Sequence, residues 1–575
     1  MRNLSLQSTS LVALTVFFLS LPALAEGPAL AKAQPPEEET LPSSRQTSQT
    51  LEQAEAHPIE SLLRSETVDG QKIQSADKIL SFYQARSFSP LWVEGDEISK
   101  PALKVIEQIR ESWVHGFNPE NYHLSNLDRL RGGALDEKTA LVFEVLMSDA
   151  VARFGHDLTG MRLSPAALKE DTSSWSRGLS ADQVLSHVAG EKDAAQQISK
   201  LEPHDALYQI LKEELRRLVT DLTTHPENEQ TRLRYSGLIH PKESHAIIPQ
   251  LRSRLNLSGA ESSLLYDELL VKAVEGFQSA NGLKPDGVIG QRTIAALNQG
   301  RTDRLVKVVA NMERLRWVGG PKPDRYISVN IPAMKLEAVS QGQVVEEMPV
   351  IVGKPSWPTA RFVAQVVGVR FNPSWHVPAN IKAAEFLPAL QKDPTVLARK
   401  NIQLLRYTPD GVEEISAEQV DWSTMTQRDV RQLGMVQEPG VRNPLGRIRV
   451  LMPNKYDIYL HDTSTPELFS RDFRALSHGC IRLSEPKKIA NFVLGKNQGW
   501  SEEKMEKHLG HTRTVEIKAE SPFSVYVLYN TIWLDREGHL IIGDDVYSLD
   551  SKLVNALQSS GKIKLPVSLS KINSL

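Results

Sequence analysis

Apolar side chains recur with helical spacing between residues 58 and 250. Ala102, Val105, Ile106 and Ile109 show it most clearly, because positions i, i+3, i+4 and i+7 fall on one face of a helix. Prolines interrupt the pattern at intervals, as they do between helices. The pattern predicts a helical scaffold domain over residues 58–250, without a group of residues typical of a reaction site.

A shorter helical pattern with a glycine-rich loop occupies residues 262–300. Leu270, Val274 and Phe277 form an apolar helical face, and a loop punctuated by glycines follows between residues 282 and 290. Glycine suits such loops because it adopts backbone conformations that other residues avoid. We therefore expect a small helical module here. A purely structural role for this module is one open interpretation.

After residue 324 the apolar positions alternate with polar ones instead. Ile327, Val329 and Ile331 alternate in this way, as in a strand with one buried face. Further β-branched runs, bounded by Gly and Pro, predict a mainly β domain over residues 324–515. The predicted fold class is therefore multidomain α+β, with a helical N-terminal scaffold, a small helical module and a mainly β domain.

One long stretch between Trp375 and Asn443 breaks the strand pattern. It mixes helical pieces with polar loops, and so long an insertion in a compact domain is usually functional or disordered. We expect an insert over about residues 376–442 that forms a mobile cap over a cleft. Trp375 offers apolar surface to cover a bound molecule, although ordinary core packing is the alternative. The last segment, residues 516–575, is expected to pack on the β domain.

The start of the chain has the features of an export signal. Residues 1–2 carry a positive charge, residues 11–21 are apolar, and residues 23–25 offer small side chains for cleavage. These features predict a signal peptide over residues 1–25, with an uncleaved anchor as the alternative. The polar composition that follows predicts a linker over residues 26–57.

Charge and hydropathy narrow the classes of partner. The formal net charge is −3 and no basic block is present, which disfavours a nucleic-acid partner. No second apolar segment approaches the ~20 residues that a membrane span needs. The mature chain is therefore predicted to work outside the cytoplasm without a membrane span.

The only cysteine of the 575 residues is Cys480, within the sequence Ser-His-Gly-Cys-Ile-Arg of residues 477–482. Exported proteins usually pair their cysteines, and a single thiol cannot form an internal disulfide. An inert buried side chain is one interpretation, since free cysteines are often buried. The neighbouring Gly, His and Arg favour a catalytic nucleophile.

A thiol nucleophile needs a base, and two histidines are candidates. His461 lies at the end of a strand-like run, from which its side chain can project into a cleft beside Tyr459. His478 is tied to the thiol locally, and adjacency in sequence rarely gives a linear proton transfer. We therefore assign His461 as the base and His478 as a secondary polar group near the substrate.

The residues around the thiol suggest how a substrate is held. Gly479 allows close approach of the backbone, and amide groups near Gly479 and Cys480 could form an oxyanion hole, with Ser477 beside them. Arg482 would share the face of Cys480 in an extended segment. Its guanidinium suits a substrate carboxylate, and a structural salt bridge is the alternative.

These residues carry a resemblance to a known family. His461 followed by Ser-His-Gly-Cys, an apolar residue and Arg482 resembles the catalytic signature of YkuD-type L,D-transpeptidases. Residues 262–300 resemble the peptidoglycan-binding type 1 module, and the whole layout is similar to the large YcbB-like branch of Gram-negative bacteria. The chain departs at Glu485, where many members have Asn.

The resemblance implies an acyl transfer in the periplasm. The thiolate of Cys480 would attack the bond after the third residue of a peptidoglycan tetrapeptide stem, releasing D-Ala and forming a thioester. An amine of a second stem would then resolve the thioester into a 3–3 cross-link. The family needs no metal or other cofactor, and its cysteine commonly reacts with carbapenems. Other wall-synthesis proteins are possible partners.

Three other functions stay open on the sequence. His508 and His511, with His461 and His478, could suggest a zinc peptidase, but the helical zinc motif with its Glu base is absent. The module alone would suit a non-catalytic wall-binding protein. The same acyl-enzyme could instead attach a protein to the wall or hydrolyse stems.

Overall fold

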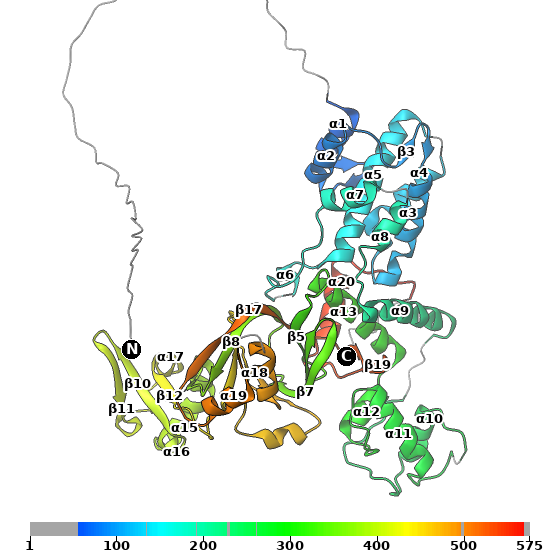
Figure 1. Cartoon of the computed structure of the whole chain (residues 1–575). Helices are drawn as coiled ribbons and strands as arrows, with labels where there is room; N and C mark the ends of the chain where they lie inside the picture. The colour runs from blue at the N-terminus through cyan, green and yellow to red at the C-terminus, as the bar shows by residue number, and fades with distance from the viewer. Residues whose placement is uncertain are drawn as a thin grey trace, which may run out of the picture. The chain divides into compact units, whose positions relative to one another are not determined.

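The computed structural model describes residues 56–567, apart from positions 134, 169, 191–192, 227–230, 260 and 496–498 (Figure 1). The expected signal peptide, residues 1–25, and nearly all of the expected linker, residues 26–57, lie outside the described residues. Among the helices that are described, none is both long and apolar enough to span a membrane.

The N-terminal region is helical, as the spacing predicts. Ala102, Val105, Ile106 and Ile109 are fully buried along one face of a helix. The region also contains two short hairpins, which consist of β1 (Thr67–Val68) with β2 (Gln71–Lys72) and β3 (Val93–Glu94) with β4 (Glu97–Ile98). The helices are α1 (Pro58–Arg64), α2 (Ala76–Ala85), α3 (Lys100–Arg110), α4 (Leu124–Arg131), α5 (Glu137–Thr159), α6 (Pro165–Leu168), α7 (Ala181–Ala189), α8 (Ala194–Ser199) and α9 (Ala206–Thr224).

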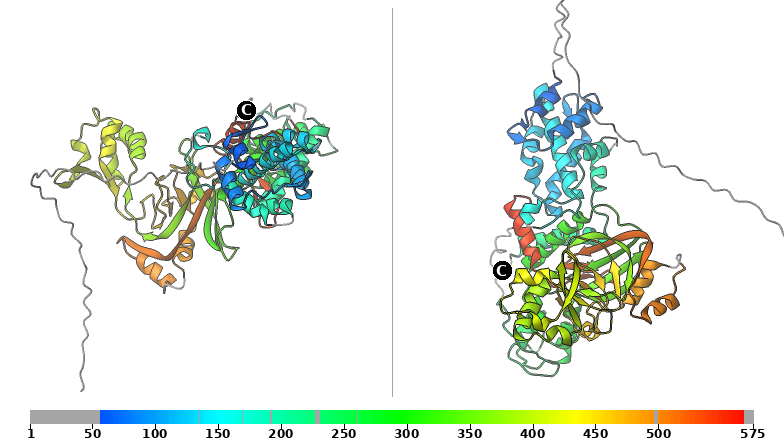
Figure 2. Two further views of the ribbon diagram at one scale, coloured as in Figure 1. Left: turned by 90° about the horizontal axis from the view of Figure 1, so that it is seen from above. Right: turned by 90° about the vertical axis from the view of Figure 1, so that its left-hand side faces the viewer.

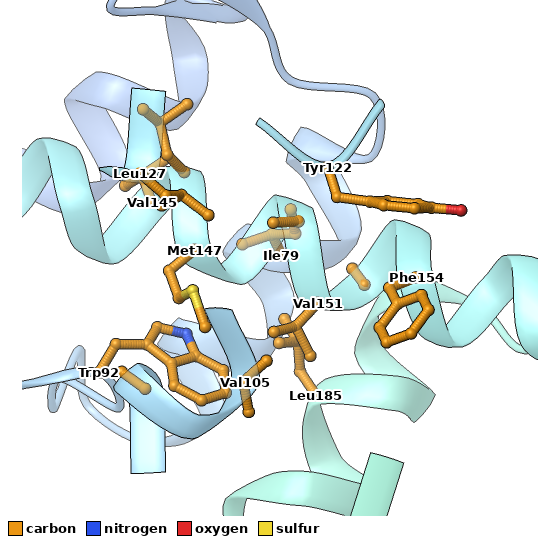
Figure 3. Close-up of a cluster of buried hydrophobic side chains, with 14 of the residues drawn as sticks. Ile79, Trp92, Val105, Tyr122, Leu127, Val145, Met147, Val151, Phe154 and Leu185 are labelled. Carbon is orange, nitrogen blue, oxygen red and sulfur yellow. The ribbon is translucent and has the colours of Figure 1, made fainter. Parts of the chain in front are cut away.

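The long helix α5 forms the centre of this region. Figure 3 shows Met147, Val151 and Phe154 of α5 among side chains from neighbouring helices, such as Val105 and Leu185. Because neighbouring helices surround α5, most of its circumference is apolar and buried.

A second core joins α9 to α13 (Arg301–Val318) and to the C-terminal helix α20 (Leu549–Ser559). A buried ion network reinforces it: Glu313 of α13 accepts from Arg162 at 2.8 Å and from Arg316 at 2.6 Å. Buried charges persist only when they are paired in this way. The helical region thus packs against α13, which precedes the β domain in the chain, and against α20, which follows it.

The small module contains α10 (Ile248–Arg254), α11 (Glu268–Ala280) and α12 (Gln291–Leu297). Its core runs from Leu233 to Leu297, so it begins well before residue 262. The glycine loop adopts the backbone expected of it, with Gly287 at a φ of 66°. The sequence missed the earlier boundary because the added residues are mostly irregular.

The β domain is built on one nine-stranded sheet that closes into a barrel. The strand order is β15-β7-β16-β14-β13-β8-β17-β5-β6, and β6 also pairs with β7. Helix α18 (Pro486–Leu494) packs against β8, β13 and β17. Figure 2 shows this orange part of the chain beside the strands of the sheet. The strands are β5 (Arg325–Asn330), β6 (Lys335–Ser340), β7 (Gln343–Gly353), β8 (Phe362–Phe371), β13 (Ile448–Leu451), β14 (Leu460–His461), β15 (Ala475–Ser477), β16 (Ile481–Leu483) and β17 (Val515–Leu528).

The expected boundary at residue 516 needs correction. Strand β17 runs from Val515 to Leu528 and lies inside the sheet, paired with β8 on one side and β5 on the other. The following segment adds the hairpin of β18 (Ile532–Leu534) and β19 (Leu540–Ile542), then α20. Strand pairing with partners almost 200 positions earlier leaves no local signal at this boundary.

The insert has a core and a sheet of its own. Its four strands follow the order β11-β10-β12-β9, which the mixture of helical pieces and loops did not predict. Trp422, which is buried in this core, illustrates its packing. The elements are β9 (Trp375–His376), α14 (Ala379–Ile381), α15 (Leu387–Lys392), α16 (Val396–Arg399), β10 (Ile402–Thr408), β11 (Gly411–Ile415), α17 (Gln427–Gln432) and β12 (Gly434–Gln437).

Candidate active site

Strand register brings the sequence-distant site residues together. Strands β14 and β16 are parallel, with His461 opposite Arg482, and the amide of Ile481 donates to the carbonyl of Tyr459 at 2.9 Å. Cys480 immediately precedes Ile481 and therefore lies beside Tyr459. Because side chains alternate along a strand, His461, Arg482, Cys480 and Tyr459 share one face.

The opposite face of these strands holds the site in place. Val450, Leu460 and Ile481 point into the barrel core and are fully buried. A shift of one residue in register would expose this set, so the core fixes which side chains face the site.

His461 is buried and neutral. Its Nδ1 lies 2.5 Å from the carbonyl oxygen of Asp462, and a carbonyl can only accept, so Nδ1 carries the proton. Burial, with the nearby positive charge of Arg482, lowers the pKa of His461 to about 3. Nε2 is therefore free to accept a proton at neutral pH.

Cys480 is half-buried, and its resting form is a thiol. Burial raises its pKa, while the Tyr459 amide and the guanidinium groups of Arg449 and Arg482 act in the opposite direction. The thiol donates a weak hydrogen bond to the carbonyl of Asp457, with an S–O distance of 3.7 Å. A neutral thiol beside a neutral imidazole favours proton transfer during attack over a preformed ion pair.

The loop before the thiol is held by its own hydrogen bonds. Ser477 Oγ donates to the carbonyl of Cys480 at 2.6 Å and accepts from the amide of Gly479 at 3.1 Å. Thr359 Oγ1 donates to the carbonyl of Gly479 at 2.8 Å. Gly479 has a φ of 111°, which other residues rarely adopt. Since the Gly479 amide is engaged, the Cys480 amide is the better candidate donor to an oxyanion.

Three parts of the chain match models of known protein families. Residues 324–517 match the family model of the L,D-transpeptidase catalytic domain, named YkuD. Residues 77–215 match a scaffold domain, and residues 245–297 match a "Putative peptidoglycan binding domain". The chain carries an L,D-transpeptidase catalytic domain. The two other matches confirm the predicted scaffold and module.

Individual relatives cover only part of this chain. A "Putative L,D-transpeptidase" of Haemophilus influenzae is 30% identical over 247 residues, which are 43% of this chain and 48% of the relative. The chain thus spans about half the length of the curated relative that it matches.

Solved structures show a weaker similarity. An L,D-transpeptidase from Mycobacterium smegmatis is 15% identical, covers 36% of this chain and 58% of its own, and has a TM-score of 0.18. L,D-transpeptidase 3 from Mycobacterium tuberculosis is 13% identical, with 36% and 61% coverage and a TM-score of 0.17. Scores this low carry no argument about this chain.

The transpeptidase domain places a second arginine in the site that the sequence reasoning missed. Arg449 of β13 pairs in register with His461, and its guanidinium lies 3.5 Å from the centre of the Tyr459 ring. Its Nε is buried and has no hydrogen-bond partner among the described residues. Arg482 donates to Thr465 Oγ1 at 3.1 Å. The only hint of this role in the sequence was the position of Arg449 as a single charged residue between the apolar residues Ile448 and Val450.

The side chain of His478 contacts the insert. Its Nε2 lies 2.5 Å from Glu385 Oε1, and its ring contacts Trp357 edge-on at 5.0 Å. Trp375 packs beside Phe386 in the insert, with ring centroids 6.3 Å apart. Trp375 and Glu385 both line a cavity of the insert, of about 360 Å³.

The histidines that could suggest zinc are not gathered into a site. His508 stacks on Trp500, with ring centroids 6.1 Å apart. Within the described residues, the one close group of three candidate ligands is Asp535, Glu537 and His539. These residues lie at the turn between β18 and β19, where the His539 amide and ring bond the Asp535 carboxylate.

Proposed function

We propose that this chain is an exported enzyme that forms 3–3 cross-links in peptidoglycan through a thioester on Cys480. The observation that supports the proposal best is the neutral His461, whose unprotonated Nε2 lies on the same face as the thiol. The periplasmic location belongs to this proposal, because the substrate lies outside the cytoplasm.

In the first step, His461 Nε2 takes the thiol proton while sulfur attacks the carbonyl carbon of the third residue of a tetrapeptide stem. The C–N bond breaks, and the protonated His461 returns the proton to the departing amine of D-Ala. General bases of this kind typically contribute ~10²–10⁴-fold in rate. We assign the Cys480 amide as a donor to the oxyanion.

The arginines of the site suit the charge of the donor. Arg449 and Arg482 lie on the two strands that flank His461 in the sheet, one on each side. Burial lowers the pKa of each guanidinium, and a carboxylate partner would compensate this cost. We assign them to a carboxylate of the stem, such as that of diaminopimelate, with Tyr459 ordering Arg449.

In the second step, an amine of another stem attacks the thioester carbon. Its excess proton passes to His461 Nε2, and the sulfur leaves as a thiolate that recovers this proton. Water or a protein amine would give hydrolysis or protein attachment by the same chemistry. The insert would cap the cleft and exclude water, which favours the amine.

The insert can be tested as a unit, because His376 of β9 pairs with Val436 of β12. Replacing residues 377–435 by a two-residue Asn-Gly turn joins neighbouring strand ends. We expect more hydrolysis relative to cross-linking. An unchanged product ratio would contradict the capping role.

The decisive experiment is incubation with purified tetrapeptide stems, followed by intact-mass and product analysis. The expected results are an acyl-enzyme that has lost D-Ala, and a cross-linked dimer. Tripeptide alone would indicate hydrolysis, and an unmodified enzyme without any product would contradict the proposal. Cys480→Ala is the matched control.

The module's contribution can be separated from catalysis. Removing residues 233–297, which hold the module's core, is expected to weaken sedimentation with insoluble wall while the thiol still reacts with a small β-lactam. Unchanged sedimentation would show that the module is only a structural support.

A further inference from the structure

The turn that faces the Cys480 thiol is unusually constrained. Asp457, whose carbonyl accepts from the thiol, has a φ of 53°, a conformation that few residues other than glycine adopt. Asn454 Oδ1 accepts from the amides of Tyr456 at 3.0 Å and Ile458 at 3.3 Å. These constraints fix the position of the Asp457 carbonyl relative to the Cys480 thiol.

A residue of the helical scaffold holds this turn from outside. Asp171 accepts a hydrogen bond from Tyr456 Oη at 2.5 Å and forms an ion pair with Lys455. These two partners are the residues that immediately precede Asp457. Hydrogen bonding with Lys455 and Tyr456 lowers the pKa of Asp171, so the carboxylate is charged throughout the neutral range.

The scaffold loop that carries Asp171 is itself fixed. Trp175 is buried against Trp317 of α13, with ring centroids 6.2 Å apart. The Ser176 amide donates to the carbonyl of Trp317 at 2.8 Å, and Thr172 is buried. The loop that carries Asp171 is therefore anchored to α13.

We propose that Asp171 is a positioning residue for the nucleophile. Acting through Tyr456, it holds the Asp457 carbonyl against the thiol, orients Sγ, and couples the scaffold domain to acylation. The inference rests on the proposed function only in taking Cys480 as the nucleophile.

The thiol has other charged or titratable neighbours, and the test must separate their effects from that of the turn. They come from every element around it: Arg449 of β13, Tyr459 and His461 on the β14 side, Arg482 of β16, His478 of the preceding loop, and the Asp457 carboxylate. A shift caused by loss of the Asp171 contact has a definite sign. A carbonyl that accepts from S–H stabilises the neutral thiol, so its release lowers the thiol pKa.

The experiment is the pH dependence of Cys480 alkylation by iodoacetamide in the full chain. Asp171→Ala and Tyr456→Phe are each expected to move the apparent thiol pKa down by about half a unit. The double variant should shift no further than either single variant, because both changes break one contact. Acylation by a carbapenem should slow about fivefold in each, because the orientation of Sγ is lost.

Asp193→Ala is the matched control, since Asp193 pairs at 2.7 Å with Lys104 inside the scaffold. Its alkylation profile should superimpose on that of the wild type. Superimposed profiles for Asp171→Ala and Tyr456→Phe would overturn the inference. Tyr456→Phe removes a single hydroxyl and decides the matter even if Asp171→Ala does not fold.

The proposed function and this inference fail in different ways. A wild-type protein that resists carbapenems and stems would contradict the proposed function. If its alkylation profile still shifted in the variants, the link from Asp171 to the thiol would stand.

Discussion

The barrel strands beside Cys480 and the insert, which contacts the neighbouring His478 through Glu385, are fixed in different ways. His461 lies in the sheet, is buried, and is oriented by the carbonyl of Asp462. His478 meets the insert at Glu385, whose side chain is 48% exposed, so solvent weakens this polar contact. The proton-transfer geometry is therefore set by the core, whereas the insert contact is easily broken and remade.

The test with the largest expected effect is the substitution of the proposed nucleophile, Cys480. Cys480→Ala is expected to abolish both turnover and carbapenem adducts, because the chain has no other thiol. Intact-mass analysis checks this. An adduct of the same mass on Cys480→Ala would end the cysteine mechanism.

The next test compares the two histidines directly. His461→Ala should slow acylation by ~10²–10⁴-fold, the usual contribution of a general base. His478→Ala should cost much less, because His478 faces the insert. Stopped-flow acylation with a carbapenem measures both, with circular dichroism to verify folding. A larger loss in His478→Ala would refute the assignment of the base.

The buried state of His461 also predicts a pH dependence of stability. Its pKa of about 3 in the folded protein lies below the usual 6.5, so the unfolded chain binds a proton that the folded chain refuses. The free energy of unfolding should therefore fall as the pH drops from 6.5 toward 3, by up to about 1.4 kcal/mol per pH unit from this group. Denaturant titrations of wild type and His461→Gln measure the difference. Equal slopes in the two proteins would contradict a neutral, buried His461.

The smallest effect is expected at the insert contact. Glu385→Gln should change acylation no more than about fivefold, since a partly exposed polar contact of this kind contributes only ~0–1 kcal/mol. Glu418→Gln, in the same insert and exposed, serves as the control. A loss as large as that of His461→Ala would show that the insert fixes the chemistry as firmly as the barrel does.

Several parts of the fold could be predicted because their signals are local. The stripe from Ala102 to Ile109 predicted a buried helical face, and the alternation around Ile327 predicted a strand of the sheet. The strands of the insert were missed, since β10 and β11 form a hairpin with an exposed face and little alternation. The place of β17 was missed because its partners are distant in sequence.

Some features of the candidate site could likewise be predicted from the sequence, and others could not. The spacing from His461 to Cys480 already suggested a nucleophile and a base, whose roles remain predictions. Arg449 carried only a weak signal. The link from Asp171 to Tyr456 spans 285 positions, so no local pattern could suggest it.

The sequence by itself determined which chemical groups are present: one thiol, two candidate bases and the flexible Gly479 beside them. Tertiary structure decided their states. Burial makes His461 neutral and Cys480 a thiol, and register places both on one face with two arginines. The physical reason is that residue type sets which protons a side chain can exchange, whereas desolvation and neighbouring charge set whether it holds them. Both depend on strands and loops that meet only in the folded chain.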